Sequence, residues 1–224
     1  MSHDRWRDEL HQARADRARL VAMLSRGAPL GGLQLAGSAI LAAGTSADLD
    51  EVVAELASRL HDRGWLGDAE LATALTERAA GRPNSLTALA VDLDELAELV
   101  DALPSSESYI DLETGAVWPG EIIDLGEGPD ELDPGDASRW LFVRGEGSQR
   151  AYADMECFIA TVEPDALSAK LREAITGRQP FKAFLNVLRR HDDQFTSWHR
   201  HRDDARIGQA RHWLAERGFE TGRS

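Results

Sequence analysis

The feature that most constrains the fold is the stretch YIDLETGAVWPGEI at residues 109–122, where side-chain character alternates with a period of two. Ile110 and Leu112 lie on one side of an extended chain, and the polar side chains between them lie on the other. Gly115 can adopt the positive φ of a tight turn, and Pro119 ends the pairing because it has no N–H to donate. The pattern predicts a β-hairpin with one apolar face, which needs a helical layer to cover it.

The rest of the chain predicts an α+β fold, in which a small antiparallel β-sheet is covered by C-terminal helices and preceded by an all-helical N-terminal unit. The run WLFV at 140–143 supplies a third strand. Helical spacing of apolar residues extends over 4–26, 33–43, 49–60, 68–77 and 93–103, and again over 149–162, 165–175, 180–188 and 202–217. The breaker-rich sequence GRPN at 81–84 separates the two parts, so we expect a helical unit at 1–85 and an α+β domain at 86–224.

The aromatic residues of the last third are spaced as a buried core. Phe181 and Phe184 begin an apolar helical stripe, and we expect both to anchor the helical layer on the sheet. Trp198, Trp213 and Phe219 follow at core positions, so packing is favoured over a base-stacking platform for this set.

The segment HDDQFTSWHRHRDD at 191–204 gathers three His and four Asp. We interpret it as a solvated polar loop that leads into the last helix. His199 and His201 are two residues apart, which is about 200° around a helix, so they would not converge on one metal ion there.

Charge is unevenly distributed along the chain, whose formal net charge is −14. Residues 40–136 hold four arginines against 23 acidic residues, whereas the remainder is mildly basic. An acidic middle repels phosphates and disfavours nucleic-acid binding by the whole protein. It attracts the arginine-bearing C-terminal helices, within the chain or in a second copy. We therefore expect salt-sensitive docking on acidic residues such as Asp92, Asp94, Glu98 and Asp101.

The sequence indicates a cytoplasmic protein. Its first residues are charged from Asp4 onward without a signal-peptide core, and the weakly polar run at 30–43 is too short to span a bilayer. Cys157 is the single cysteine, which excludes an internal disulfide and gives no metal-ligand spacing. We therefore expect no cofactor, no metal ion and no membrane association.

Several segments in the last part of the chain form a joint pattern. They are IDLETG with VWPGEI, YADMECFIATV at 152–162, AITGRQPFKAFLNVL at 174–188, Trp198, and ARHWLAERGF at 210–219. Together they resemble the bacterial uncharacterised protein family 0158 over roughly residues 90–220. The resemblance implies the fold of this unit but no activity, because none is established for the family. Cys157 stands where a carboxylate is expected and Gln179 and Pro180 where small residues are common, so these positions receive no role.

The strand face of the hairpin is the first candidate site. Tyr109, Asp111 and Glu113 lie together on it, and Trp118 follows on the return strand. Neighbouring carboxylates can separate their pKa values and act as acid and base, or can hold a divalent cation. Because the solvent faces of strands are commonly acidic, a structural role is favoured here, followed by a binding face and then by catalysis.

The segment RGEGSQR at 144–150 is the second candidate site. Free N–H groups at a helix N-terminus attract anions, and Arg144 and Arg150 flank this turn. A tight turn with Ser148 as the N-cap explains the same residues.

We favour a non-catalytic protein that binds a protein partner or assembles as a homo-oligomer. One alternative is a nucleic-acid or nucleotide binder with an arginine-lined surface made from Arg144, Arg150, Arg189, Arg190, Arg200 and Arg202. The other is a hydrolase-like enzyme that uses Asp111 and Glu113. A single positive groove would favour the former, and a deep pocket holding both carboxylates would favour the latter.

Overall fold

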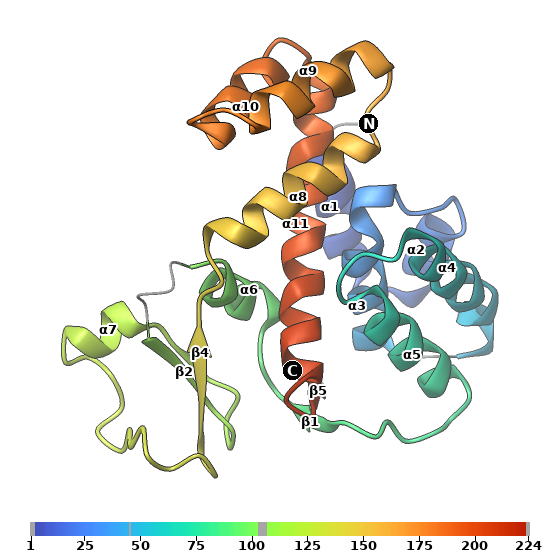
Figure 1. The fold of residues 1–224 in the computed structure, drawn as a ribbon. Coiled ribbons are helices and arrows are strands. Elements are labelled where there is room, and N and C mark those ends of the chain that lie inside the picture. Colours follow the sequence, from blue (N-terminus) through green and yellow to red (C-terminus); the bar gives the residue numbers. More distant parts are fainter. Residues whose placement is uncertain (1–2, 45, 103–106, 223–224) are drawn as a thin grey trace.

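The computed structural model describes residues 3–44, 46–102 and 107–222, and the long helix α11 (Asp192–Ala215) forms its central axis (Figure 1). The N-terminal helices lie on one side of α11, and a small sheet lies on the other side, next to α6 (Leu93–Asp101). Further helices gather around the N-terminal end of α11.

The N-terminal unit is all-helical, as the spacing of its apolar residues predicts. It comprises α1 (His3–Ala13), α2 (Arg17–Leu24), η1 (Leu30–Gly32), α3 (Leu33–Ala43), η2 (Ala47–Leu49), α4 (Asp50–Arg63) and α5 (Asp68–Ala79). The stripe of Val53, Leu56 and Leu60 is buried, and α4 packs against α5. Gly64 ends α4 in the left-handed conformation, which glycine adopts without steric cost.

The predicted hairpin is present in a three-stranded antiparallel sheet with the order β3-β2-β4. Its strands are β2 (Glu107–Asp111), β3 (Val117–Trp118) and β4 (Trp140–Arg144), and the short helix α7 (Gly120–Asp124) follows β3. Gly115 has a φ of 76° in the turn, and a Cβ there would collide with the carbonyl of Ala90, so the position requires glycine. A separate parallel pair joins β1 (Thr87–Leu89) to β5 (Phe219–Thr221). The α+β fold class is confirmed.

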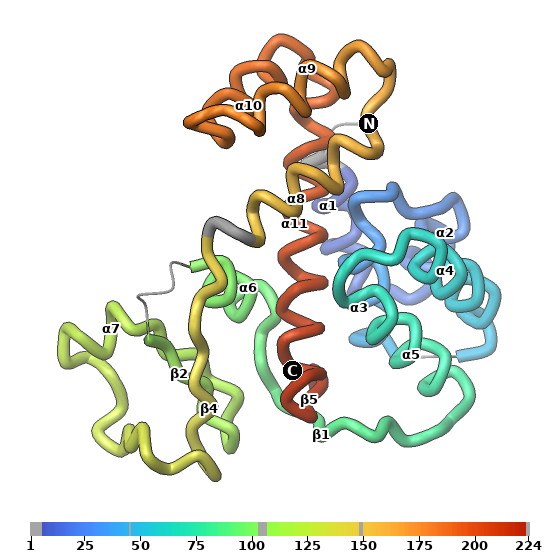
Figure 2. Tube along the Cα trace, in the orientation of Figure 1, coloured from blue at the N-terminus to red at the C-terminus, as the bar shows by residue number. Residues whose placement is uncertain are grey.

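The apolar face of the sheet lies in a core that extends through the molecule. Ile110 and Val143 of the sheet share one buried cluster with Val100 of α6, Ile207 of α11 and the N-terminal helices. Figure 2 shows the chain leaving α5, running past the C-terminal end of α11 and turning into α6. The boundary at 85/86 therefore crosses a continuous core, and the division of the chain at this point stays a prediction.

Helices α8 (Ser148–Ala160), α9 (Asp165–Ile175) and α10 (Pro180–Leu188) build a second core. Phe184 is fully buried there, with its ring centre 4.8 Å from that of Trp198 and 6.1 Å from that of Phe158. The prediction that Phe181 and Phe184 anchor helices on the sheet is therefore wrong, because α10 packs against α9 and α11 instead. Phe181 lies in the first turn of α10, where it borders a surface cavity and is 38% exposed.

Helix α11 begins earlier than predicted. The segment 191–204, interpreted above as a solvated loop and helix start, is helical from Asp192 onward. Trp198, His201 and Asp204 within it are buried. The interpretation failed because polar side chains that are paired inside the protein look, in sequence, like the side chains of a solvated segment.

Candidate functional site

The outer face of the sheet brings the aromatic residues of the first candidate site together. Tyr109 in β2 stands opposite Trp118 in β3 and Phe142 in β4, so the three side chains share one face. Arg144 continues this face opposite Glu107. The rings of Tyr109 and Phe142 are 5.5 Å apart, and Phe142 is 41% exposed. The face thus presents Phe142 to solvent beside a buried tyrosine.

Asp111 is a buried residue that shapes the hairpin turn. Its Oδ1 accepts a hydrogen bond from the N–H of Glu113 at 2.9 Å, and its carbonyl accepts one from Gly115 at 2.7 Å. Burial by itself would raise the pKa of Asp111. The hydrogen bonds from Glu113 and Thr114, together with the charge of Arg139 at 3.5 Å, outweigh burial and lower this pKa below its ordinary value.

Glu113 lies in the turn, beyond the end of β2, rather than on the strand face that the alternation predicts. Its side chain is 71% exposed, and its Oε2 is 3.9 Å from Nε of Arg139. A general acid in an acid–base pair needs a raised pKa, whereas that of Asp111 is lowered. The geometry therefore gives no support to the hydrolase-like alternative.

The second candidate site differs from the prediction at Ser148. Helix α8 starts at Ser148, and Gly147 occupies the N-cap position with a φ of 61°, a conformation that favours glycine. The side chain of Ser148 lies outside what the structure describes. Arg150 pairs with Glu146 at 2.8 Å, so its charge is balanced.

The arginines of the nucleic-acid alternative are distributed over separate places. Arg189 and Arg190 follow α10, Arg200 lines a cavity beside Trp65, and Arg202 pairs with Asp101. Nothing in the described part of the chain supports one arginine-lined groove.

Docking of α11 on the acidic segment is present within the chain. Arg202 and Arg206 reach Oδ2 of Asp101 at 3.0 and 3.5 Å. Arg7 of α1 pairs with Asp94 at 3.3 Å. The exposed Arg7–Asp94 pair contributes about 0–1 kcal/mol, and the salt sensitivity of these contacts stays a prediction.

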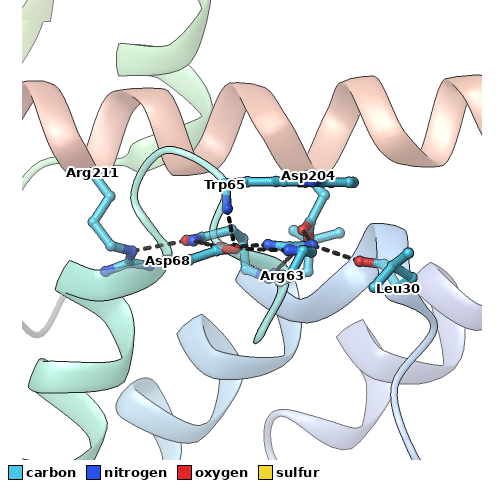
Figure 3. Close-up of polar contacts among 8 residues, drawn as sticks. Leu30, Arg63, Trp65, Asp68, Asp204 and Arg211 are labelled. Atoms are coloured by element: carbon cyan, nitrogen blue, oxygen red, sulfur yellow. Dashed lines mark hydrogen bonds and ion pairs between the residues drawn. The ribbon is translucent and has the colours of Figure 1, made fainter. Parts of the chain in front are cut away.

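Sequence reasoning missed a buried ionic network that joins α11 to the N-terminal unit (Figure 3). Arg63 at the end of α4 donates from Nε to Asp68 at 2.8 Å and from Nη1 to Asp204 of α11 at 2.6 Å. All three side chains are at most 2% exposed. Asp204 also accepts hydrogen bonds from the N–H groups of Gln34 and Leu35 at 3.0 and 3.3 Å. It thereby caps α3 from another helix.

A second buried arginine, Arg211, extends the network. It donates to Gln34 at 3.0 Å and to Ser38 at 2.7 Å, and Gln34 in turn donates to Asp68 at 2.8 Å. Burial lowers the pKa of Arg211 to about 10, so it stays charged at neutral pH. Burial would also lower the pKa of Arg63, but its two aspartate partners raise it above its ordinary value. Two arginines balance two aspartates, which is typical of a structural network.

The place of this network depends on a close backbone contact. Asp68 lies inside the first turn of α5, and Gly67 occupies the N-cap position with a φ of 84°. A Cβ on Gly67 would collide with the carbonyl of Gly208, and one on Gly208 with that of Leu66. Gly208, which is unfavourable in a helix interior, is the sequence signal that could have indicated this contact.

A surface cavity of about 230 Å³ borders Asp154, Asp101, Arg202 and Phe181. Asp154 is 8% exposed and accepts hydrogen bonds from Nε2 of Gln209 at 3.1 and 3.3 Å. Burial raises the pKa of Asp154 to about 6, and the charge of Asp101 adds to this effect. Perturbed carboxyls occur in functional and in structural sites, and an amide partner alone indicates no reaction.

The described residues contain no group of three or more His, Cys, Asp or Glu placed to hold a metal ion. None of the helices in these ranges is long and apolar enough to cross a membrane. Cys157 is exposed, and partial burial of its thiol together with the nearby carboxylates raises its pKa, opposite to what an activated nucleophile needs.

Residues 83–222 match the model of a family described as uncharacterised protein family UPF0158. The chain belongs to this family. UPF0158 protein PA5073 of Pseudomonas aeruginosa is 29% identical over 136 residues, which are 59% of this chain and 86% of that protein. No solved structure matches the chain. The resemblance of the hairpin and C-terminal helices to this family is thus confirmed.

Some of the sites described above lie inside the residues that match UPF0158, and others lie before them. The aromatic face, Asp154, Asp204 and Arg211 lie inside residues 83–222, whereas Arg63 and Asp68 lie before them. In this chain the N-terminal unit therefore supplies the partners for buried charges of the family unit.

Proposed function

We propose that this UPF0158 protein is a non-catalytic cytoplasmic interaction protein that binds an extended segment of a protein partner along β4. The proposal rests on the position of Phe142. It is an exposed aromatic residue in the middle of an edge strand, and its ring packs against Tyr109. Asp111 shapes the turn and Glu113 projects into solvent, so the same hairpin offers a contact face rather than reactive groups.

The edge of β4 is suited to accept a further strand. In β2, the N–H of Asp111 bonds to Ala116 on the β3 side at 3.0 Å. The N–H of Leu112 bonds to Arg139 on the β4 side at 2.8 Å. Successive residues of a strand direct their backbone groups to alternate sides. Arg139 directs its carbonyl to the β2 side, so Phe142, three residues further along the chain, directs its backbone N–H and carbonyl away from β2. A partner segment would hydrogen-bond to them by strand addition.

The side chains of β4 would select the segment. Phe142 and Arg144 lie on the same face of the sheet, with Tyr109 and Trp118 behind Phe142. An extended peptide presents alternate side chains to this face, so one apolar side chain would pack on Phe142. Aromatic residues of this kind contribute much of the binding free energy at protein interfaces.

Photo-crosslinking in the native cell tests the proposal. A benzophenone amino acid replaces Phe142, and a matched protein carries it at Leu125, an apolar residue that is 73% exposed and lies outside the sheet. We expect an adduct from position 142 that maps by mass spectrometry to one short segment of a partner, or of a second copy of this chain. Equal yields at the two positions, or none at 142, would contradict strand addition at β4.

A further inference from the structure

A second cavity, of about 230 Å³, lies where α11 faces η1 and Trp65. Gln194, Ser197, Arg200 and His201 line it from α11. Residues 194, 197 and 201 follow the i, i+3, i+7 spacing of one helix face. The cavity is therefore built along a polar stripe of the central helix.

Polar side chains of this stripe lack the hydrogen-bond partners that the buried polar residues further along α11 have. Asp204, Gln209 and Arg211 are hydrogen-bonded inside the protein. By contrast, within residues 3–44, 46–102 and 107–222, the structure shows no side-chain hydrogen bond or ion pair for Ser197 or Arg200. The Nε of Arg200 is buried without a partner. Buried donors of this kind cost free energy unless a water or ligand binds them.

His201 adds an acceptor to the cavity. It is 3% exposed, its ring centre is 4.2 Å from that of Trp65, and its Nε2 has no hydrogen-bond partner. The ring bonds to the backbone carbonyl of Asp154, and since Nε2 has no partner, Nδ1 is the nitrogen assigned to this bond and to the proton. Burial, together with the smaller effect of the charge of Arg63, outweighs this hydrogen bond and lowers the pKa of His201 to about 4. A neutral ring protonated at Nδ1 leaves Nε2 as an acceptor.

We propose that this cavity binds a small oxyanion that also carries a hydroxyl group. The anionic oxygens pair with Arg200, and the ligand hydroxyl donates to Nε2 of His201. Ser197 and Gln194 are placed to bond the remaining oxygens, and Trp65 forms an apolar wall. Hydrogen phosphate and small hydroxycarboxylates both have this pair of groups. Sulfate and simple carboxylates have the charge without the hydroxyl.

Calorimetric titration of the full chain near neutral pH, at constant ionic strength, compares four probes in two matched pairs. Inorganic phosphate is paired with sulfate, and glycolate is paired with acetate. We expect the hydroxyl-bearing anion of at least one pair to bind about tenfold more tightly than its partner, because only it satisfies the buried acceptor. The pair that shows the preference identifies the ligand as a phosphate or as a hydroxycarboxylate.

Three variants and one spectrum complete the test. Arg200→Gln should abolish binding, His201→Phe should remove the preference, and Arg190→Gln, which changes an exposed arginine outside the cavity, should bind as the wild type does. The long-range ¹H–¹⁵N spectrum of the wild-type histidine rings should show an unprotonated Nε2 at His201, whether or not the variants fold. Equal binding within both pairs, no binding of any probe, or a proton on Nε2 would each overturn the proposal.

Discussion

The free energy of unfolding should depend on pH through Asp154 and His201, and the two residues should act in opposite directions. Single substitutions at each residue would reveal the two contributions. The two residues are neighbours, because the His201 ring bonds to the backbone carbonyl of Asp154, and both are at most 8% exposed. Burial raises the pKa of Asp154 from 3.8 to about 6. It lowers the pKa of His201 from 6.5 to about 4.

The signs follow from which state holds each proton. Between pH 3.8 and about 6 the folded protein keeps a proton on Asp154 that the unfolded chain has lost, so stability falls as the pH rises through this window. Between pH 6.5 and about 4 the unfolded chain binds a proton on His201 that the folded protein does not, so stability falls as the pH drops. Each difference corresponds to about 3 kcal/mol, so the two effects nearly cancel in the wild type.

Asp154→Asn removes the titrating carboxyl and keeps an oxygen that can accept from Gln209. It should raise the free energy of unfolding at pH 7 by up to about 3 kcal/mol. On acidification its stability should fall more steeply than that of the wild type. In His201→Gln the free energy of unfolding should fall less steeply on acidification than in the wild type. This difference in slope does not depend on how much stability the variant loses through poorer packing.

Urea unfolding of the three proteins at closely spaced pH values measures these slopes. Contributions that a substitution does not change cancel in each variant-minus-wild-type difference. Parallel curves for wild type and both variants would refute the reasoning, because neither pKa would then differ between the folded and unfolded states.

Three further predictions concern the cores. Arg63→Met should lower the free energy of unfolding by about 3–5 kcal/mol, because it leaves two buried aspartates without their cation. Arg26→Met at the surface should change it by less than about 0.5 kcal/mol in the same denaturation assay. Phe184→Ala should lower the free energy of unfolding by about 3–5 kcal/mol, and Phe181→Ala should lower it much less. Equal shifts of the melting temperature would contradict the assignment of Phe184 to the core and of Phe181 to the surface. Proteolysis near 81–86 should leave two fragments that stay associated in native gel filtration, because they share one core, whereas native dissociation would show independent domains.

The hairpin could be predicted because its determinants are local. Alternation, a turn glycine and a proline within residues 109–122 specify two strands and the turn between them. The role of Asp111 could not be predicted in the same way. Alternation places it on a solvent face, whereas its burial depends on β4 and on Arg139, which follow it by about 30 residues of chain.

The buried network could not be predicted because its members are distant in sequence. Arg63 and Asp204 are separated by 141 positions, and each alone looks like an ordinary surface charge. The first turns of α11 could not be predicted either, because their buried face is polar. Apolar periodicity is the main sequence signal for a helix, and this helix buries His201 and Asp204 on the face that an apolar stripe would normally occupy.

The two proposed sites depend on different parts of the chain. Phe142 and the edge of β4 lie within the UPF0158 match, so strand addition there needs only the family unit. The anion cavity also needs η1 and Trp65, which precede residue 83 and are held against α11 by the Arg63 network. A substitution at Phe142 should therefore leave anion binding unchanged, and one at Arg200 should leave the β4 contact unchanged. Loss of both by either substitution would mean that they report one site or one loss of folding.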